Sequence, residues 1–494
     1  MRVALAALLG LAAACSVADT DLGGAREVTF PDGFLWGSAT AGFQIERGLP
    51  NTDWGVWAAT EGKIAGGDHP DVGGPDALAH VAEDVAILAR LGQSAYRFSI
   101  EWARLYPTRA AFDEDRPDPE AIAAYDRLFA ALRAAAIRPM VTLQHFALPD
   151  YLSDPRRPEE PQGWEREDTV ALFPEWCARV AARWGGEVDW WATINEPIVS
   201  PLAGYVAGTF PPGRLLEVER GFRVAKNEVR GHARCYDAIK RADVVDADGD
   251  GAASRVGIVH HLRAVEPEDP SEPADQVAAE RVRYVNNTWL LEAAIRGNLD
   301  DDLDGRLDGP TDRVDDPELR GRSDWLGVNY YSALVATSRG IRLPIVDAFI
   351  KLDHLPTTRP KTDFGWDIYP EGLGIVLAEV APYGLPVIVT ENGIADASDA
   401  NRGRFVLEHL FELGRARDRL GLEVLGYFYW SLLDNFEWAD GFCPRFGLAS
   451  VDRATARRGV RPSAEIYAAA ARSGRVTRAE IDRQPPYAAP TYCE

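Results

Sequence analysis

Short apolar runs alternate with longer amphipathic stretches along nearly the whole chain. The runs are rich in β-branched and aromatic residues and end where polar residues begin, a pattern that predicts buried strands. There are eight of them, at residues 34–40, 94–100, 139–145, 190–195, 256–260, 325–331, 386–391 and 424–430. Strands separated by helices in this way predict an α/β fold with parallel strands.

The stretches between the runs carry apolar residues at helical spacing. The clearest predicted helices span residues 76–91, 120–136 and 401–420. Glycines follow three of the helical stretches, as expected of C-terminal caps: Gly92, Gly185 and Gly421.

Eight strand-then-helix units predict one closed parallel barrel, a (β/α)8 or TIM barrel, because an open sheet of this size would leave edges. The length of 494 residues suits a single domain of this kind with long loops. We expect the barrel to span residues 29–475 and a C-terminal tail to span 476–494. The sequence shows no internal repeat or further domain boundary.

Polar side chains follow the predicted strands at their C-terminal ends, where such barrels carry their chemistry. These residues are Gln44, His145, Asn195, Glu196, Asn329, Tyr331, Glu391 and Trp430. A carboxylate at the end of a buried strand is costly unless it has a partner or a task. Glu196 and Glu391 therefore predict a pair for acid/base and nucleophilic work on a glycosidic bond.

Composition and charge narrow the class of partner. Apolar residues make up 46% of the chain, which is enough for a large core. The formal charge of −23 disfavours nucleic acid and anionic membrane surfaces, because both would repel the protein. The 14 Trp and 16 Tyr residues suit sugar-stacking surfaces, although most such side chains simply pack.

The first residues have the composition of an export signal. Met1 and Arg2 precede an Ala- and Leu-rich segment, which predicts a signal peptide over residues 1–15. The sequence before Cys15 is similar to a lipobox, although Leu11 lies one place early. We expect an exported protein anchored through a lipid on Cys15, with 16–28 as a short tether; plain secretion and a cytoplasmic location are the alternatives.

The remaining cysteines and the acidic runs give weaker signals. Cys177, Cys235, Cys443 and Cys493 have no metal-motif spacing; one disulfide is possible, but its pairing cannot be assigned. Acidic runs at 246–251 and 300–305 match only the first half of a calcium loop. We expect solvated loops there, with calcium binding as the alternative.

Six segments in register then resemble family 1 glycoside hydrolases, the β-glucosidases and their relatives. They lie at residues 34–46, 96–102, 195–197, 329–331, 390–393 and 429–438. The resemblance covers about residues 29–470 and implies a (β/α)8 barrel and a retaining mechanism, with two carboxyl groups about 5–5.5 Å apart. It implies no metal and no organic cofactor, since both catalytic groups are side chains.

The resemblance also implies roles for individual residues. Glu391 matches the nucleophile and Glu196 the acid/base, with Arg97, Asn329 and Tyr331 around them. The expected sugar contacts are Asn195 at the 2-hydroxyl, Gln44, His145, Glu437 and Trp438 at the other hydroxyls, and Trp430 beneath the ring. The carboxylate of Glu437 suits a neutral sugar, because it would repel a 6-phosphate. Phe146 departs from the tryptophan that many relatives have after the histidine.

We therefore expect a retaining β-glucosidase that acts on small β-glucosides or cello-oligosaccharides. The alternatives are a β-galactosidase or β-fucosidase and a transglycosylase on the same site, or a non-catalytic sugar-binding barrel. Glu196 and Glu391 would then be members of structural ion pairs, and His145 a core histidine. The aglycone and the oligomeric state cannot be read; residues 341–363 are a candidate lid on length and irregularity alone.

Overall fold

The computed structural model describes residues 24–343, 348–350 and 357–493. The predicted signal peptide, Cys15 and most of the tether lie outside this part of the chain. Much of the candidate lid does too, apart from β8 (Ile341–Leu343), β9 (Ala348–Ile350) and the residues from Thr357 onward.

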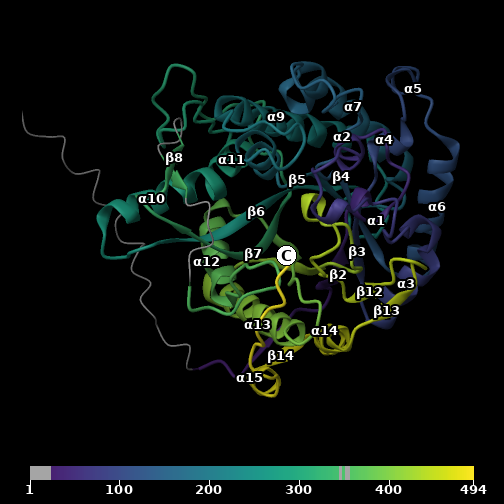
Figure 1. Ribbon diagram of the computed structural model, residues 1–494. Coiled ribbons are helices and arrows are strands. Elements are labelled where there is room, and N and C mark those ends of the chain that lie inside the picture. The colour runs from purple at the N-terminus through teal and green to yellow at the C-terminus, as the bar shows by residue number, and fades with distance from the viewer. Residues whose placement is uncertain (1–23, 344–347, 351–356, 494) are drawn as a thin grey trace, which may run out of the picture.

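The eight predicted strands form a closed parallel barrel, which confirms the fold class (Figure 1). In sequence order they are β2 (Leu35–Ala39), β3 (Ala95–Ser99), β4 (Arg138–Gln144), β5 (Trp190–Asn195), β6 (Arg255–Pro267), β7 (Trp325–Ala336), β10 (Val387–Asn392) and β11 (Val424–Trp430). Each pairs with its sequence neighbours in the barrel, and β11 pairs with β2 to close it. All eight C-terminal ends therefore lie at one end of the barrel.

Two strands are longer than their apolar runs predict. β6 continues past His260 to Pro267, and β7 continues past Tyr331 to Ala336. Beyond the barrel these extensions pair with each other, from Ala264 opposite Ala333 to Pro267 opposite Ala336. In β6 the charged residues Arg263 and Glu266 interrupt the apolar run and ended the predicted strand early, because a two-stranded ribbon can expose one face to solvent. The β7 extension is mostly apolar, and its predicted end at Tyr331 was too early.

Helices follow the strands and cover the barrel (Figure 1). The longest are α3 (Val81–Arg90), α6 (Pro119–Ala134), α7 (Glu167–Trp184), α9 (Val218–Ala242), α10 (Pro273–Arg283), α12 (Pro370–Val380), α13 (Arg402–Leu420) and α14 (Pro462–Ser473). Shorter ones are α1 (Gly42–Ile45), α2 (Asp53–Ala58), α4 (Trp102–Leu105), α5 (Arg109–Asp113), α8 (Val199–Pro201), α11 (Trp289–Leu291) and α15 (Arg478–Asp482). None of the described helices is both long and apolar enough to cross a membrane.

Two helix ends differ from the prediction. The helix predicted from residue 76 begins at Val81, because Asp76 is left-handed at φ 54° and a separate 3-10 turn follows it. Gly92 and Gly421 have the left-handed conformation of C-terminal caps. Gly185 does not, at φ −57°; a Cβ there would lie 2.2 Å from Asp243 Oδ1, so close packing explains this glycine.

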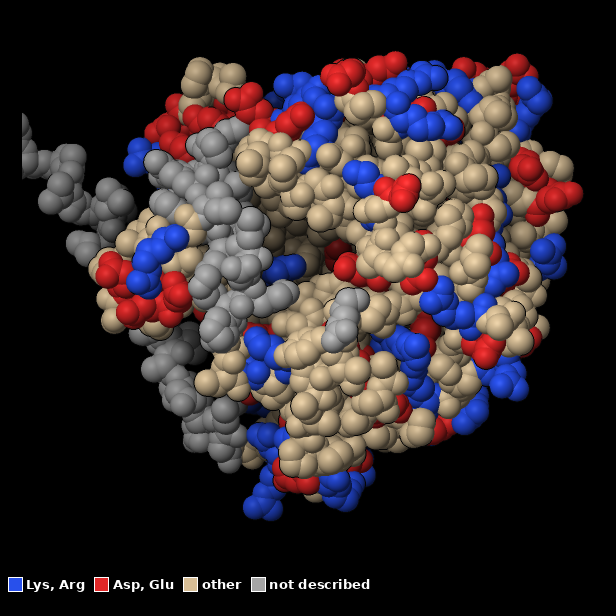
Figure 2. Space-filling model, in the orientation of Figure 1, with Lys and Arg blue, Asp and Glu red and all other residues tan. Residues whose placement is uncertain are grey.

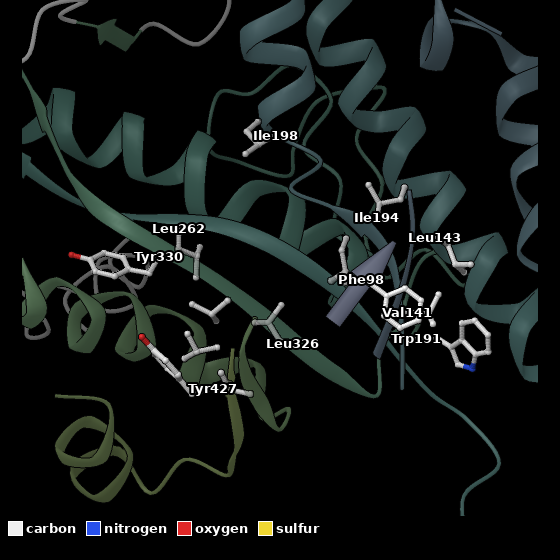
Figure 3. Packing of buried hydrophobic residues seen from close by; sticks show 14 of the residues in the cluster. Phe98, Val141, Leu143, Trp191, Ile194, Ile198, Leu262, Leu326, Tyr330 and Tyr427 are labelled. Carbon is white, nitrogen blue, oxygen red and sulfur yellow. The ribbon is translucent and has the colours of Figure 1, made fainter. Parts of the chain in front are cut away.

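The core has two layers. One layer packs the outer faces of the strands against the helices, and Figure 3 shows members of it such as Leu262, Leu326, Tyr330 and Tyr427. The other fills the barrel interior and includes Val259 and Trp430. Strand side chains alternate between these layers, so the polar residues at the strand ends are held from both sides.

The first and last described segments are tied to the barrel. β1 (Glu27–Thr29) pairs with β14 (Arg475–Thr477), so residues 27 and 28 belong to the folded unit rather than to the expected tether. Disulfides join Cys177 to Cys235 and Cys443 to Cys493. The first links α7 to α9, and the second holds the predicted tail against the domain; the sequence predicted neither pairing.

Candidate active site

Residues from four strands meet at the C-terminal end of the barrel around one buried arginine. Arg97 of β3 is fully buried, and its Nη1 donates to Glu391 Oε1 at 2.6 Å. Its Nη2 donates to Asn195 Oδ1 at 2.7 Å, and its Nε to Thr142 Oγ1 at 3.1 Å. The guanidinium thus fixes the Glu391 carboxylate of β10 and the Asn195 amide of β5 relative to each other.

Glu391 has the surroundings of an ionised carboxylate. Besides Arg97 at one oxygen, the Tyr331 hydroxyl donates to Glu391 Oε2 at 2.6 Å. Burial raises the pKa of Glu391 above its ordinary value, and the charge and hydrogen bonds of Arg97 and Tyr331 offset part of this rise. Both of its oxygens are therefore held by donors that favour the charged form.

Glu196 has the opposite environment. Its only described side-chain partner is the Asn329 amide, which donates to Glu196 Oε1 at 2.7 Å. Thr390 Oγ1 donates to Asn329 Oδ1 at 2.7 Å and so orients that amide. Burial and the neighbouring charge of Glu391 raise the pKa of Glu196 to about 8. At neutral pH this carboxyl group holds a proton.

The two carboxyl groups therefore titrate as an interacting pair in a definite order. Glu391 loses its proton first because a cation and a hydroxyl hold its charge. Glu196 keeps its proton because it faces an amide and the negative charge of Glu391. One ionised and one protonated carboxyl group is the state that glycosidic bond cleavage with a carboxylate nucleophile requires.

A second polar cluster lies beside this pair. Glu437 Oε1 accepts from Trp430 Nε1 at 3.1 Å and from Asn435 Nδ2 at 2.9 Å. Glu437 Oε2 accepts from Gln44 Nε2 at 3.2 Å. Burial raises the pKa of Glu437 to about 8, against these hydrogen bonds. The buried Gln44 Oε1 has no described partner and can accept a hydrogen bond from a ligand.

His145 joins the two clusters. Asn195 Oδ1 accepts from Arg97, so its Nδ2 donates to His145 Nε2 at 3.1 Å. Burial and the charge of Arg97 hold the pKa of His145 well below its ordinary value. The ring is neutral with its proton on Nδ1, and Nδ1 is buried without a described partner. It can donate to a ligand hydroxyl.

Aromatic rings line the cluster. The ring of His145 lies nearly parallel to Trp430 at 5.9 Å and to Trp438 at 6.0 Å. Phe146, the departure from the family pattern, packs edge-on against Trp438 at 5.1 Å and against Phe210 at 5.7 Å. Flat apolar faces beside buried hydrogen-bonding groups suit a sugar ring.

All eleven site residues predicted from the sequence thus lie in one connected cluster. The prediction missed His261 and Arg263, which follow the expected end of the fifth strand. Burial and the charge of Arg263 hold the pKa of His261 well below its ordinary value. The alternation of Val259, His261 and Arg263 along one face of β6 is the signal that could have found them.

The acidic runs lie apart from this site. In the first, Asp246 accepts hydrogen bonds from the backbone of Gly249, Asp250 and Gly251. Asp189, Asp246 and Asp248 form one group of carboxylates, and Asp300, Asp302 and Asp304 form another. Backbone groups of the same loops partner several of these oxygens, which accounts for the acidic residues as loop-forming.

The fold and the unequal carboxyl pair define a class, the glycosidases built on a (β/α)8 barrel. Comparison with known proteins agrees. Residues 26–475 match the family model described as Glycosyl hydrolase family 1. The chain is 34% identical to a β-galactosidase of Pyrococcus woesei, over 87% of this chain and 94% of the relative.

Two further proteins show the same similarity. The chain is 33% identical to β-glucosidase A of Thermotoga maritima, over 89% of this chain and 96% of the relative. The β-glycosidase structure from Thermosphaera aggregans superposes with a TM-score of 0.80 at 28% identity, covering 93% of this chain and all of that one. The chain belongs to glycosyl hydrolase family 1 and is a retaining β-glycosidase.

Proposed function

We propose that the protein is a β-glucosidase that removes terminal non-reducing β-D-glucosyl residues from small β-glucosides or cello-oligosaccharides. One observation carries the reaction: Glu391 is held by Arg97 and the Tyr331 hydroxyl, whereas Glu196 faces only the Asn329 amide. This difference supports Glu391 as the nucleophile and Glu196 as the acid.

In the first step a Glu391 oxygen attacks the anomeric carbon, and Glu196 gives its proton to the glycosidic oxygen as that bond breaks. A covalent glycosyl-enzyme forms, and the negative charge of Glu391 disappears. Because that charge is one cause of the raised pKa of Glu196, the pKa of Glu196 falls in the intermediate.

In the second step the ionised Glu196 takes a proton from water, and the water oxygen attacks the anomeric carbon. The bond to Glu391 breaks, and the sugar leaves with its original configuration. Arg97 and Tyr331 again hold the carboxylate charge of Glu391, which makes it a better leaving group.

The glucosyl specificity rests on the polar cluster around Glu437 and on relatives such as the Thermotoga maritima protein named β-glucosidase A. Gln44 Oε1 and His145 Nδ1 are an acceptor and a donor free for sugar hydroxyls. A galactosyl substrate is the second candidate, because the similar Pyrococcus woesei protein is named β-galactosidase.

We also propose that the protein is exported and lipid-anchored through Cys15. Disulfides persist in oxidising compartments, and the described chain contains two of them. Expression of the full chain and of Cys15→Ala tests the anchor. Activity that moves from the membrane fraction to the medium or periplasm in the variant supports it, and an unchanged distribution contradicts it.

Proton NMR of an aryl β-D-glucoside digest tests the reaction. β-Glucose as the first product establishes hydrolysis with retention, and α-glucose overturns the mechanism. The ratio of kcat/KM for 4-nitrophenyl β-D-glucoside, galactoside and fucoside then tests the sugar. A galactoside preferred over the glucoside would replace the β-glucosidase proposal with the second candidate.

A further inference from the structure

Strand β6 extends beyond the barrel and places one charged side chain, Arg263, on the side of Glu196. In the register of the barrel, Val259 lies opposite Asn195 and His261 lies opposite Asn329. Val259 belongs to the cluster inside the barrel, so the alternating residues His261 and Arg263 point to the same side. The rings of His261 and Tyr331 lie 6.2 Å apart, which places this face of β6 at the catalytic residues.

The backbone of Arg263 is held by an amide clamp. The register between β6 and β7 shifts between Leu262 and Ala264, where regular pairing is interrupted. Asn287 replaces the lost contacts: its Oδ1 accepts from Arg263 N at 3.1 Å, and its Nδ2 donates to Arg263 O at 2.8 Å. Nδ2 of Asn287 also donates to Glu379 Oε2 at 2.6 Å. The position of Arg263 is therefore fixed by the fold.

The side chain of Arg263 is partly buried and has no described hydrogen-bond or ion-pair partner. Burial lowers the pKa of Arg263, while the charge of Glu196 raises it, so the two groups are close enough to interact. In the reactive form Glu196 is protonated, and the charges of Arg97 and Glu391 compensate each other. Among the described residues, the guanidinium of Arg263 is then a cation without a local counter-charge, a costly arrangement unless a ligand supplies one.

The location of Arg263 indicates which part of a substrate it meets. Gln44, Glu437 and Trp430 form the polar cluster for the glycosyl unit. Glu196 protonates the glycosidic oxygen, so a group beside Glu196 and outside that cluster faces the leaving group. A guanidinium binds a carboxylate through two parallel hydrogen bonds, which neutral hydroxyls match less well.

We propose that Arg263 binds an anionic group, such as a carboxylate, on the aglycone and thereby selects anionic β-glycosides. This inference rests on the proposed function, because it concerns the leaving-group side of the same site. Figure 2 shows a hollow near the middle of the visible face in which basic and acidic atoms are both exposed.

The test compares two aryl β-D-glucosides that differ in charge but little in shape, with a 4-carboxyphenyl and a 4-carbamoylphenyl aglycone. The quantity is the ratio of their kcat/KM values in the wild type, Arg263→Gln and Arg263→Lys. Differences in leaving-group ability cancel when ratios are compared. Arg138→Gln, at the N-terminal start of β4, is the control with the same change of charge.

We expect Arg263→Gln to lower the ratio about tenfold, as the loss of one charged hydrogen-bonded contact predicts. Arg263→Lys should retain part of the preference, and Arg138→Gln should retain the wild-type ratio. The same ratio in wild type and Arg263→Gln would overturn the inference, even if both glucosides are hydrolysed.

If neither glucoside is hydrolysed, the proposed function fails and binding decides the inference. The Glu391→Gln variant and the double variant with Arg263→Gln are then titrated with both glucosides by calorimetry. Tighter binding of the carboxylate that disappears in the double variant supports the role of Arg263. Equal dissociation constants for the two glucosides, or failure of both to bind, refute it.

Discussion

Replacing Tyr331 by Phe removes one of the two donors that hold Glu391 ionised. The Tyr331 hydroxyl lies 2.6 Å from Glu391 Oε2, and both side chains are buried. A hydrogen bond to a charged group contributes roughly 1.5–3 kcal/mol. We therefore expect kcat/KM to fall roughly 10- to 150-fold, with a small change in melting temperature.

The same change has a signature in the pH profile. The Tyr331 hydroxyl lowers the pKa of Glu391, so its loss raises that pKa. Because Glu391 must be ionised to attack, the acidic limb of kcat/KM should move to higher pH. The assay is kcat/KM for an aryl β-D-glucoside across the pH range in which the variant stays folded.

Tyr330→Phe is the matched control, because the neighbouring Tyr330 hydroxyl donates to Tyr369 O at 2.6 Å on the other face of β7. It should leave the acidic limb in place. An acidic limb that does not move in Tyr331→Phe, or that moves equally in both variants, would refute the assignment of Glu391 as the ionised nucleophile.

Three further predictions concern Glu196 and the two disulfides. Glu196→Gln should lower kcat on an activated aryl glucoside by roughly 10²- to 10⁴-fold, and added azide should restore turnover as glucosyl azide; no rescue would exclude Glu196 as the base. In the wild type, kcat/KM should fall as the pH rises through about 8, where Glu196 loses its proton, whereas a flat basic limb would contradict this order of ionisation. Cys443→Ser with Cys493→Ser should cost about 2–4 kcal/mol of unfolding free energy, measured by denaturant titration beside the Cys177→Ser/Cys235→Ser pair; unchanged stability would show that the C-terminal link does not constrain the chain.

The barrel strands could be predicted because parallel strands buried on both faces appear as continuous apolar runs. The same signal fails outside the barrel. The extensions of β6 and β7 pair with each other beyond the barrel. Charged residues interrupt the apolar run in the β6 extension, so only the alternation along one face marks it as strand. The helix predicted from residue 76 begins only at Val81, because the left-handed backbone conformation of Asp76 interrupts it.

The site residues could be predicted as a set, because each follows a strand end or lies in one of the recognised segments. Their interactions could not. Arg97 bonds to residues 45, 98 and 294 positions away in the chain, a relation that only the closed barrel creates. The disulfides show the same limit, since four cysteines allow three pairings and no spacing rule selects among them.

Backbone conformation at the site is the least predictable feature. Phe146, Glu196 and Trp438 all have positive φ, at 62°, 51° and 54°, a region that costs residues with side chains about 1–2 kcal/mol each. Local propensity favours an extended or helical backbone at each of them. A prediction from the local sequence would therefore give their side chains a different direction. Tertiary contacts hold them: Glu196 N donates to Val259 O at 2.9 Å, and Phe146 and Trp438 pack on each other. The strain therefore lies at Glu196 and at the rings of Phe146 and Trp438, where the barrel around them, rather than their own sequence, sets the direction of the side chain.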